Sequence, residues 1–240
     1  MDRRSFLGKS AKIGVGLVGG SVLLSACASG DKSGKMTPLR QPGEYYVPEL
    51  PDKAIDGKEL KVGVIGCGGR GSGAVEDLLN AADGIKVTAL GDVFADRLTG
   101  LRENLKTKWN QEVPEDHCFT GFEAYKQVID SGVDMVIVAT PPVFRPTHFK
   151  YATEKGVHSF LEKPIAVDAK GYRLIMATAK QAEAKGLSVV TGTQRHHQRP
   201  YVESFKRIQE GMIGEITGGN VYWNQGMLWY KERQQGWSDM

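Results

Sequence analysis

The chain has 240 residues, of which 31 are basic and 28 are acidic, and its formal net charge is +3. Residues 1–26 contain four of the basic residues and one of the acidic residues, which leaves 27 of each sign in the rest of the chain. Because that remainder is neutral overall and has no basic stripe, the composition argues against nucleic acid as a partner.

The first 27 residues have the pattern of an export signal. Arg3 and Arg4 precede an apolar, glycine-rich stretch over about 13–24, which is shorter than the roughly 20 residues of a membrane-spanning helix. The paired arginines resemble a twin-arginine export signal, and the Leu-Ser-Ala tripeptide before Cys27 resembles a bacterial lipoprotein cleavage box. We therefore expect lipidation at Cys27 and a periplasmic or cell-envelope lipoprotein that meets the membrane only through this anchor. An uncleaved N-terminal anchor is the alternative.

Residues 28–58 contain four prolines among Gly, Ser, Lys and Asp residues and show little apolar periodicity. This composition predicts an extended linker. If Cys27 is lipidated, two cysteines remain. Because Cys67 lies inside a glycine-rich turn that a disulfide would distort, we expect Cys67 and Cys118 to be free, partly buried thiols.

An apolar strand expected over 60–66 leads into the turn Gly66-Cys-Gly-Gly-Arg-Gly71 and then into a helix expected over 70–82. Asp92 stands 21 residues after Gly71, at the end of the next apolar run. This order is typical of a dinucleotide-binding domain, in which helix-start amides face a diphosphate and the acid binds a ribose. A purely structural glycine turn, or the similar turn of methyltransferases, is the alternative. The candidate cofactor contacts in this segment are Gly66, Gly68, Gly69, Arg70, Gly71 and Asp92.

Strands and helices alternate from residue 60 to residue 193. Strands are expected at 60–66, 85–91, 117–120, 133–139, 157–162 and 187–193, and helices at 70–82, 95–108, 122–131, 146–155 and 168–185. The nearly continuous apolar runs indicate strands that are covered on both faces. We therefore predict an α/β fold with a doubly wound parallel Rossmann sheet over 59–192, and ligands at the carboxyl ends of its strands.

The last part of the chain, 193–240, has a different character. A helix is expected from Pro200 to about Gln209, and a strand over 215–224 carries Tyr222 and Trp223. A single strand cannot satisfy its own backbone groups and needs partner strands. We therefore expect the truncated start of a second, α+β sheet domain that serves substrate binding or dimerisation.

Two further motifs follow the fourth and fifth strands, Ala139-Thr140-Pro141-Pro142 and Glu162-Lys163-Pro164. Together with the glycine turn, they resemble the Gfo/Idh/MocA family of NAD(P)-dependent sugar and cyclitol oxidoreductases, over roughly 58–225. The resemblance implies hydride transfer between a nicotinamide cofactor and a hydroxyl of a sugar, glycoside or cyclitol. It also implies a homo-oligomer that pairs through its second sheet.

The cofactor is expected to be NAD, because the carboxylate of Asp92 repels the 2′-phosphate of NADP. Arg70 and Arg97 weaken this preference, so NADP stays open.

The same resemblance assigns roles by position. Lys163 lies where family members place a lysine beside the nicotinamide ribose and the reacting hydroxyl, so it is the candidate catalytic residue, and with Glu162 it is also a candidate cofactor contact. Thr140 and Pro141 lie where the family lines the nicotinamide half of the cleft. An ammonium at a strand end can donate to a developing alkoxide. The alternative for Lys163 is an ion pair with Glu162 or another neighbouring carboxylate.

Polar side chains follow the sixth strand, where the family places residues that meet substrate and cofactor. Arg195, His196 and His197 are the candidate substrate contacts, with helix-capping or surface roles as the alternative. Two adjacent histidines without a third ligand do not make a metal site, so no metal is predicted. His148, on an otherwise packed helix, is interpreted as structural.

Two other functions compete with a simple dehydrogenase. The first is a glycoside hydrolase that oxidises its sugar transiently, as relatives with N-acetylgalactosaminidase activity do. Those relatives carry valine in place of the lysine and a Tyr-x-His-Asp element near 222–225, and this chain has neither feature. The second is a non-catalytic nucleotide- or sugar-binding lipoprotein. Because the second domain is expected to be incomplete, we expect residues 28–240 alone to turn over no substrate.

Overall fold

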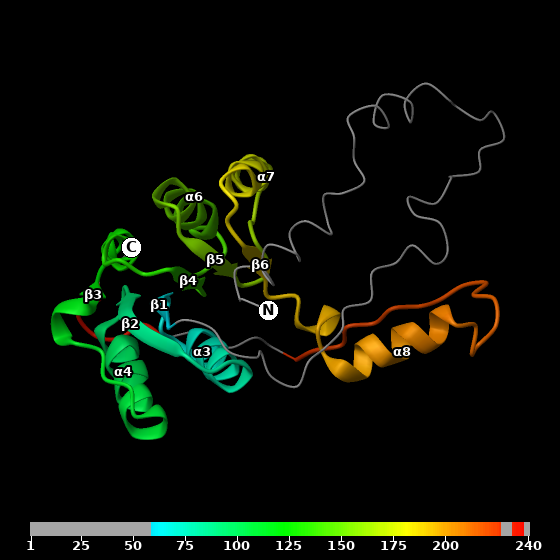
Figure 1. Ribbon diagram of the computed structural model, residues 1–240, viewed down its shortest axis with the longest axis horizontal. Helices are drawn as coiled ribbons and strands as arrows, with labels where there is room; N and C mark the ends of the chain where they lie inside the picture. The colour runs from blue at the N-terminus through cyan, green and yellow to red at the C-terminus, as the bar shows by residue number, and fades with distance from the viewer. Residues whose placement is uncertain (1–58, 227–231, 238–240) are drawn as a thin grey trace.

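The computed structural model describes residues 59–226 and 232–237. The predictions for the export signal, Cys27 and the linker lie outside these residues. The described chain forms one six-stranded, fully parallel sheet with the strand order β3-β2-β1-β4-β5-β6 (Figure 1). The predicted doubly wound Rossmann fold is therefore confirmed.

The strands and helices follow the alternation that the sequence predicts. The strands are β1 (Leu60–Ile65), β2 (Ile85–Asp92), β3 (Cys118–Thr120), β4 (Met135–Val138), β5 (His158–Leu161) and β6 (Val189–Thr191). The helices are α3 (Gly69–Ala81), α4 (Ala95–Trp109), α5 (Ala124–Asp130), α6 (Arg145–Lys155), α7 (Ala169–Ala184) and α8 (Arg199–Gln209), with short 3₁₀ turns η1 (Glu115–His117) and η2 (Gln194–His196).

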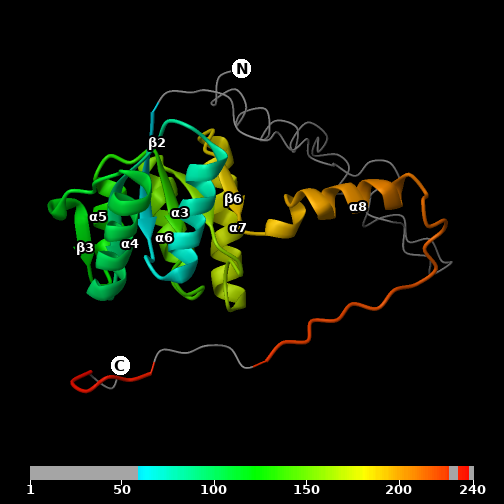
Figure 2. The same cartoon turned by 90° about the horizontal axis from the view of Figure 1, so that it is seen from below.

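Two helical layers cover the sheet, α3 and α4 on one face and α5, α6 and α7 on the other (Figures 1 and 2). The central strand β1 shows why both layers are needed. Val62 and Val64 belong to the apolar cluster under α3 and α4, whereas Ile65 belongs to the cluster under α5 and α6. Gly63 faces the second layer, where an added Cβ would lie 2.5 Å from Val128. The run from Val62 to Ile65 is therefore buried on both sides, as a central strand of a parallel sheet requires.

The helix α7 illustrates how local sequence sets element boundaries. Asp168 caps its N-terminus, where Oδ1 accepts a hydrogen bond of 2.6 Å from the backbone N–H of Gly171. Gly186 follows its C-terminus with a φ of +68°, a conformation that glycine adopts without strain. The boundaries of α7 therefore lie within about one residue of those expected.

The predicted strand over 215–224 is wrong. Residues 215–226 form no helix or strand; α8 extends away from the β6 side of the sheet, and the chain turns back beyond its far end (Figure 2). The reason is that no strand of the described chain lies beside the segment to accept its backbone hydrogen bonds. Its apolar side chains are accordingly exposed, Val221 by 98% and Trp223 by 68%.

The two described cysteines, Cys67 and Cys118, form no disulfide, as predicted. In the residues that the structure covers, no helix combines the length and the apolar character needed to cross a membrane.

Candidate cofactor and substrate cleft

A cleft of about 1230 Å³ opens at the carboxyl ends of the strands. It lies where β1 and β4 are neighbours but their following helices, α3 and α6, pass to opposite faces of the sheet. Such a switch point is the usual ligand site of doubly wound sheets. Its lining includes every predicted cofactor contact, namely Gly66, Gly68, Gly69, Arg70, Gly71, Asp92, Thr140, Pro141, Glu162 and Lys163.

The glycine turn forms one wall of the cleft, and its glycines serve two different purposes. An added Cβ on Gly71 would lie 1.8 Å from the carbonyl oxygen of Gly66, so the start of α3 packs directly on the end of β1. Gly66 has a φ of +95° and sits 2.8 Å, measured from its ideal Cβ position, from backbone atoms of Ala139 and Thr140. These two glycines are therefore required by packing.

Gly68 and Gly69, in contrast, have enough space around them for a side chain. The nearest atom to an added Cβ on Gly68 is Nη1 of Arg97 at 3.4 Å, and an added Cβ on Gly69 would meet nothing within 4 Å. No side chain caps the N-terminus of α3, so the first amides of the helix keep their hydrogen-bonding capacity. An open, uncapped helix start beside bare glycines fits a diphosphate group.

Asp92 holds the turn from the side of β2. Its Oδ2 accepts the N–H of Cys67 at 2.7 Å, and its Oδ1 accepts the N–H of Phe94 at 2.9 Å. Each carboxylate oxygen has a second lone pair, so the side chain can still accept from a ribose hydroxyl. Burial, reinforced by the charge of Asp92, raises the pKa of the Cys67 thiol well above its usual range. Cys67 is therefore a protonated filler of the turn.

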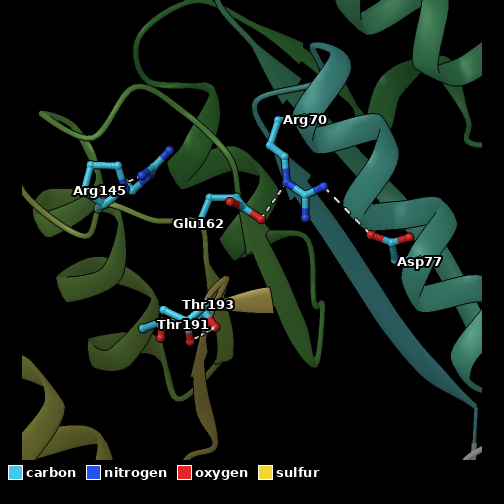
Figure 3. A network of polar contacts seen from close by, with 7 residues as sticks. Arg70, Asp77, Arg145, Glu162, Thr191 and Thr193 are labelled. Carbon is cyan, nitrogen blue, oxygen red and sulfur yellow. Dashed lines mark hydrogen bonds and ion pairs between the residues drawn. The ribbon is translucent and has the colours of Figure 1, made fainter. Parts of the chain in front are cut away.

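The Glu162-Lys163-Pro164 segment forms the opposite wall. Glu162 is 2% exposed, and its Oε1 accepts a hydrogen bond of 2.7 Å from Nε of Arg70, which reaches across from α3 (Figure 3). An added Cβ on Gly192 would lie 2.7 to 2.9 Å from the Glu162 carboxyl group, so that carboxylate also packs on the chain after β6. The Lys163–Pro164 peptide bond is cis.

Lys163 lines the cleft without a counter-ion among the described residues. The expected alternative, an ion pair between Lys163 and Glu162, is absent there because Arg70 pairs with this carboxylate. The exposed ammonium of Lys163 is thus available to a ligand.

Arg145 lines the cleft although the sequence reasoning did not select it. It is 5% exposed, its Nη1 donates to the carbonyl oxygen of Pro164, and its Nε has no partner in the described chain (Figure 3). Burial lowers the pKa of the Arg145 guanidinium, and the charge of Glu162 opposes that shift. The signal in the sequence was its place four residues after Pro141, at the first position of a helix.

His148 is buried, as its structural interpretation requires, and it also borders the cleft. It stacks on Tyr125 with ring centroids 4.2 Å apart, and its Nδ1 lies 3.2 Å from Oγ1 of Thr140. Burial lowers the pKa of His148 to about 4. The neutral ring therefore fixes the orientation of a hydroxyl that faces the cleft.

The candidate substrate residues Arg195, His196 and His197 are exposed and lie outside the lining of the cleft. Nε of Arg195 donates to the hydroxyl of Tyr201 at 2.9 Å, and its guanidinium lies 4.7 Å from the ring centroid of Trp223. Gln194 and Gln198, on either side of this group, line the cleft instead. Substrate contact by Arg195, His196 and His197 stays a prediction.

Metal ligands do not gather in the part of the chain that the structure covers, since no three His, Cys, Asp or Glu side chains come together there.

Comparison with known proteins agrees with this geometry. Residues 60–191, more than half of the chain, match the Gfo/Idh/MocA family model, which is described as "Oxidoreductase family, NAD-binding Rossmann fold". A glycosyl hydrolase family 109 protein of Streptomyces coelicolor is 26% identical over 221 residues, which cover 92% of this chain and 44% of that protein. An alpha-N-acetylgalactosaminidase of Shewanella oneidensis is 23% identical over 95% of this chain and 47% of its own.

Solved structures show the same fold. Myo-inositol 2-dehydrogenase from Lactobacillus plantarum superposes with a TM-score of 0.55 at 25% identity, covering 66% of this chain and 43% of that one. Scyllo-inositol dehydrogenase from Lactobacillus casei, solved with NAD(H) and scyllo-inositol, gives a TM-score of 0.55 at 23% identity, over 67% and 44% of the two chains. The chain thus spans a little under half the length of the curated relatives that it matches.

Gly71→Ala tests the packing of the glycine turn. Because the new Cβ would overlap a backbone oxygen that cannot rotate away, we expect the free energy of unfolding to fall by at least about 2 kcal/mol in urea denaturation. Gly73→Ala, two residues further along α3, is the control. Its Cβ would lie 3.6 Å from Nη1 of Arg70, and alanine should raise the stability by about 0.5 to 1 kcal/mol. A Gly71→Ala variant as stable as the parent would contradict the close approach.

His148→Gln tests the buried histidine through pH. The pKa is about 4 in the folded chain and about 6.5 when unfolded, so the unfolded chain binds one more proton between these values. The contribution to stability is complete above about pH 6.5 and is lost as the pH falls toward about 4. The variant should therefore show a flatter dependence of the unfolding free energy on pH over this window, by up to about 1.4 kcal/mol per pH unit. Equal slopes in the two proteins would show that His148 titrates normally.

Proposed function

The chain belongs to the Gfo/Idh/MocA oxidoreductase family, and from this premise we propose that the protein transfers a hydride between NAD and a hydroxyl group of a cyclitol or sugar. The observation that carries the proposal is that the glycine turn, Asp92 and Lys163, which has no counter-ion among the described residues, line one cleft. The structural likeness to myo-inositol 2-dehydrogenase makes cyclitols the first substrate class to test. A homo-oligomer, implied by the family, stays a prediction.

The position of each residue in the cleft indicates the role that it would have in the reaction. NAD, when bound, supplies the nicotinamide carbon that accepts or gives the hydride. The amides at the start of α3 would hold its diphosphate, and Asp92 would accept hydrogen bonds from the ribose. Lys163 would donate a hydrogen bond to the substrate oxygen while negative charge develops on it. Thr140, held by His148, would border the nicotinamide half of the cleft.

The proposal also covers the cell compartment. The twin-arginine route carries folded proteins, so a Rossmann domain exported this way and anchored through Cys27 could take its cofactor along. Free NAD is scarce outside the cytoplasm, and we therefore expect a tightly held nucleotide. When the protein is purified without added cofactor and then denatured, a nicotinamide nucleotide should appear in the supernatant. Its complete absence would contradict a tightly held cofactor.

A glycoside hydrolase that oxidises its sugar transiently is the second candidate, because curated relatives are described as glycosyl hydrolase family 109 proteins. The lysine at position 163 favours the dehydrogenase. A chromogenic N-acetylgalactosaminide separates the two functions, since only the hydrolase releases the free aglycone. A dehydrogenase would form a ketone and reduced cofactor.

Lys163→Met, made in the full-length protein, tests the proposed catalytic role. The substrates tested are scyllo-inositol, myo-inositol and glucose. Removing one donor to a developing oxyanion should lower the rate of NADH formation by about 100-fold or more, while calorimetry should show NAD affinity within about threefold. Lys180→Met, which removes an exposed lysine of α7, is the matched control and should leave both quantities unchanged. Full turnover by Lys163→Met would exclude this lysine from the reaction.

A further inference from the structure

Arg70 and Glu162 are both expected to contact the cofactor, but their side chains contact each other (Figure 3). The pair joins residues 92 positions apart and crosses from the glycine turn to the wall that carries Lys163. It is the one ion pair between these two walls among the described residues. Through such an ion pair, ligand binding at the glycine turn can affect the position of the Glu162-Lys163-Pro164 segment.

The Arg70 end of the pair faces the expected diphosphate. Arg70 is the second residue of α3, and its side chain is about half exposed. Its guanidinium carries five N–H donors, of which only Nε is within hydrogen-bonding distance of Glu162. Nη1 lies 3.8 Å from the exposed carboxylate of Asp77, too far for a hydrogen bond. Several donors are therefore free to bind a diphosphate while Nε keeps its contact.

The Glu162 end is held by packing and by backbone hydrogen bonding. Its carboxylate is almost fully buried and packs against Gly192, and its backbone N–H donates to the carbonyl of Val138 on β4 at 3.0 Å. Behind it, the guanidinium of Arg145 donates to the carbonyl of Pro164. The residue between these two anchors is Lys163. A force on the Glu162 side chain thus acts on the backbone that aims the Lys163 ammonium.

We propose that Arg70 is a positioning residue that links diphosphate binding at the glycine turn to the placement of Lys163 through Glu162. This inference rests on the proposed function, because it takes the glycine turn as the diphosphate site. Arg70 binds the diphosphate with its free N–H groups and Glu162 with Nε. Through Arg70, binding of the diphosphate would thus hold the Glu162-Lys163-Pro164 segment in place.

The test uses ADP, which has the diphosphate but no nicotinamide and so ends short of Lys163. The intact protein is labelled at its lysines by reductive methylation, with and without saturating ADP, and the labelling rate of Lys163 is measured by peptide mass spectrometry relative to Lys180. ADP occupancy is set by calorimetry for each variant. In the parent protein, we expect ADP to change the Lys163 rate by at least about fivefold.

Four variants show whether the ADP effect depends on the pair between Arg70 and Glu162. Arg70→Met removes the donor and Glu162→Gln removes the negative charge of the acceptor, so ADP at saturation should change the Lys163 rate by less than about twofold. Asp77→Asn removes the other, distant carboxylate near Arg70 and should keep the full effect. Arg70→Lys, which keeps the charge but not the forked donors, should restore part of it. A role of Arg70 in stability alone would alter the melting temperature without altering the ADP effect.

Three outcomes would overturn the proposal. If ADP binds the parent protein but leaves Lys163 labelling unchanged, or if Arg70→Met responds as the parent does, the link does not exist and the proposed function stands. If neither ADP nor NAD binds the parent protein, the proposed function fails together with this inference.

Discussion

The close approach of α3 to the end of β1 is the contact on which the cleft depends. Gly71 packs on the carbonyl oxygen of Gly66 so tightly that no side chain fits between them. From the other side, Asp92 accepts the N–H of Cys67. These contacts fix the turn between a helix and two strands and leave its open side facing the cleft. Backbone packing therefore forms this candidate anion site.

Much of this arrangement could be predicted from the sequence because it is encoded locally. Apolar runs define the strands, Asp168 and Gly186 mark the ends of α7, and the glycine spacing identifies the turn. The strand over 215–224 could not be predicted in this way, since a strand requires a neighbour that local sequence does not supply. The same holds for the cleft-facing roles of Arg145, Gln194 and Gln198, because the orientation of a helix start or a 3₁₀ turn toward a cleft depends on tertiary packing.

The distribution of charge around Glu162 also depends on tertiary contacts. A carboxylate as buried as this one requires positive charge nearby, and the chain supplies it from Arg70 on α3 and Arg145 on α6. Because two arginines neutralise Glu162, Lys163 keeps its ammonium for the cleft. A dehydrogenase and a hydrolase that works by transient oxidation would use the same nucleotide turn. The side chains around the substrate, rather than the Rossmann sheet, would therefore decide between oxidation and hydrolysis.

The buried thiol in the turn has a consequence for chemical durability. Cys67 is 2% exposed, its Sγ donates to the carbonyl of Gly91 at 3.5 Å, and burial keeps it protonated. Peroxides, alkylating agents and disulfide exchange all act on accessible thiolates. The sulfur atom in the turn is thus a poor target for these reagents, and we expect the glycine turn to tolerate oxidising surroundings that would modify a reactive cysteine at this position.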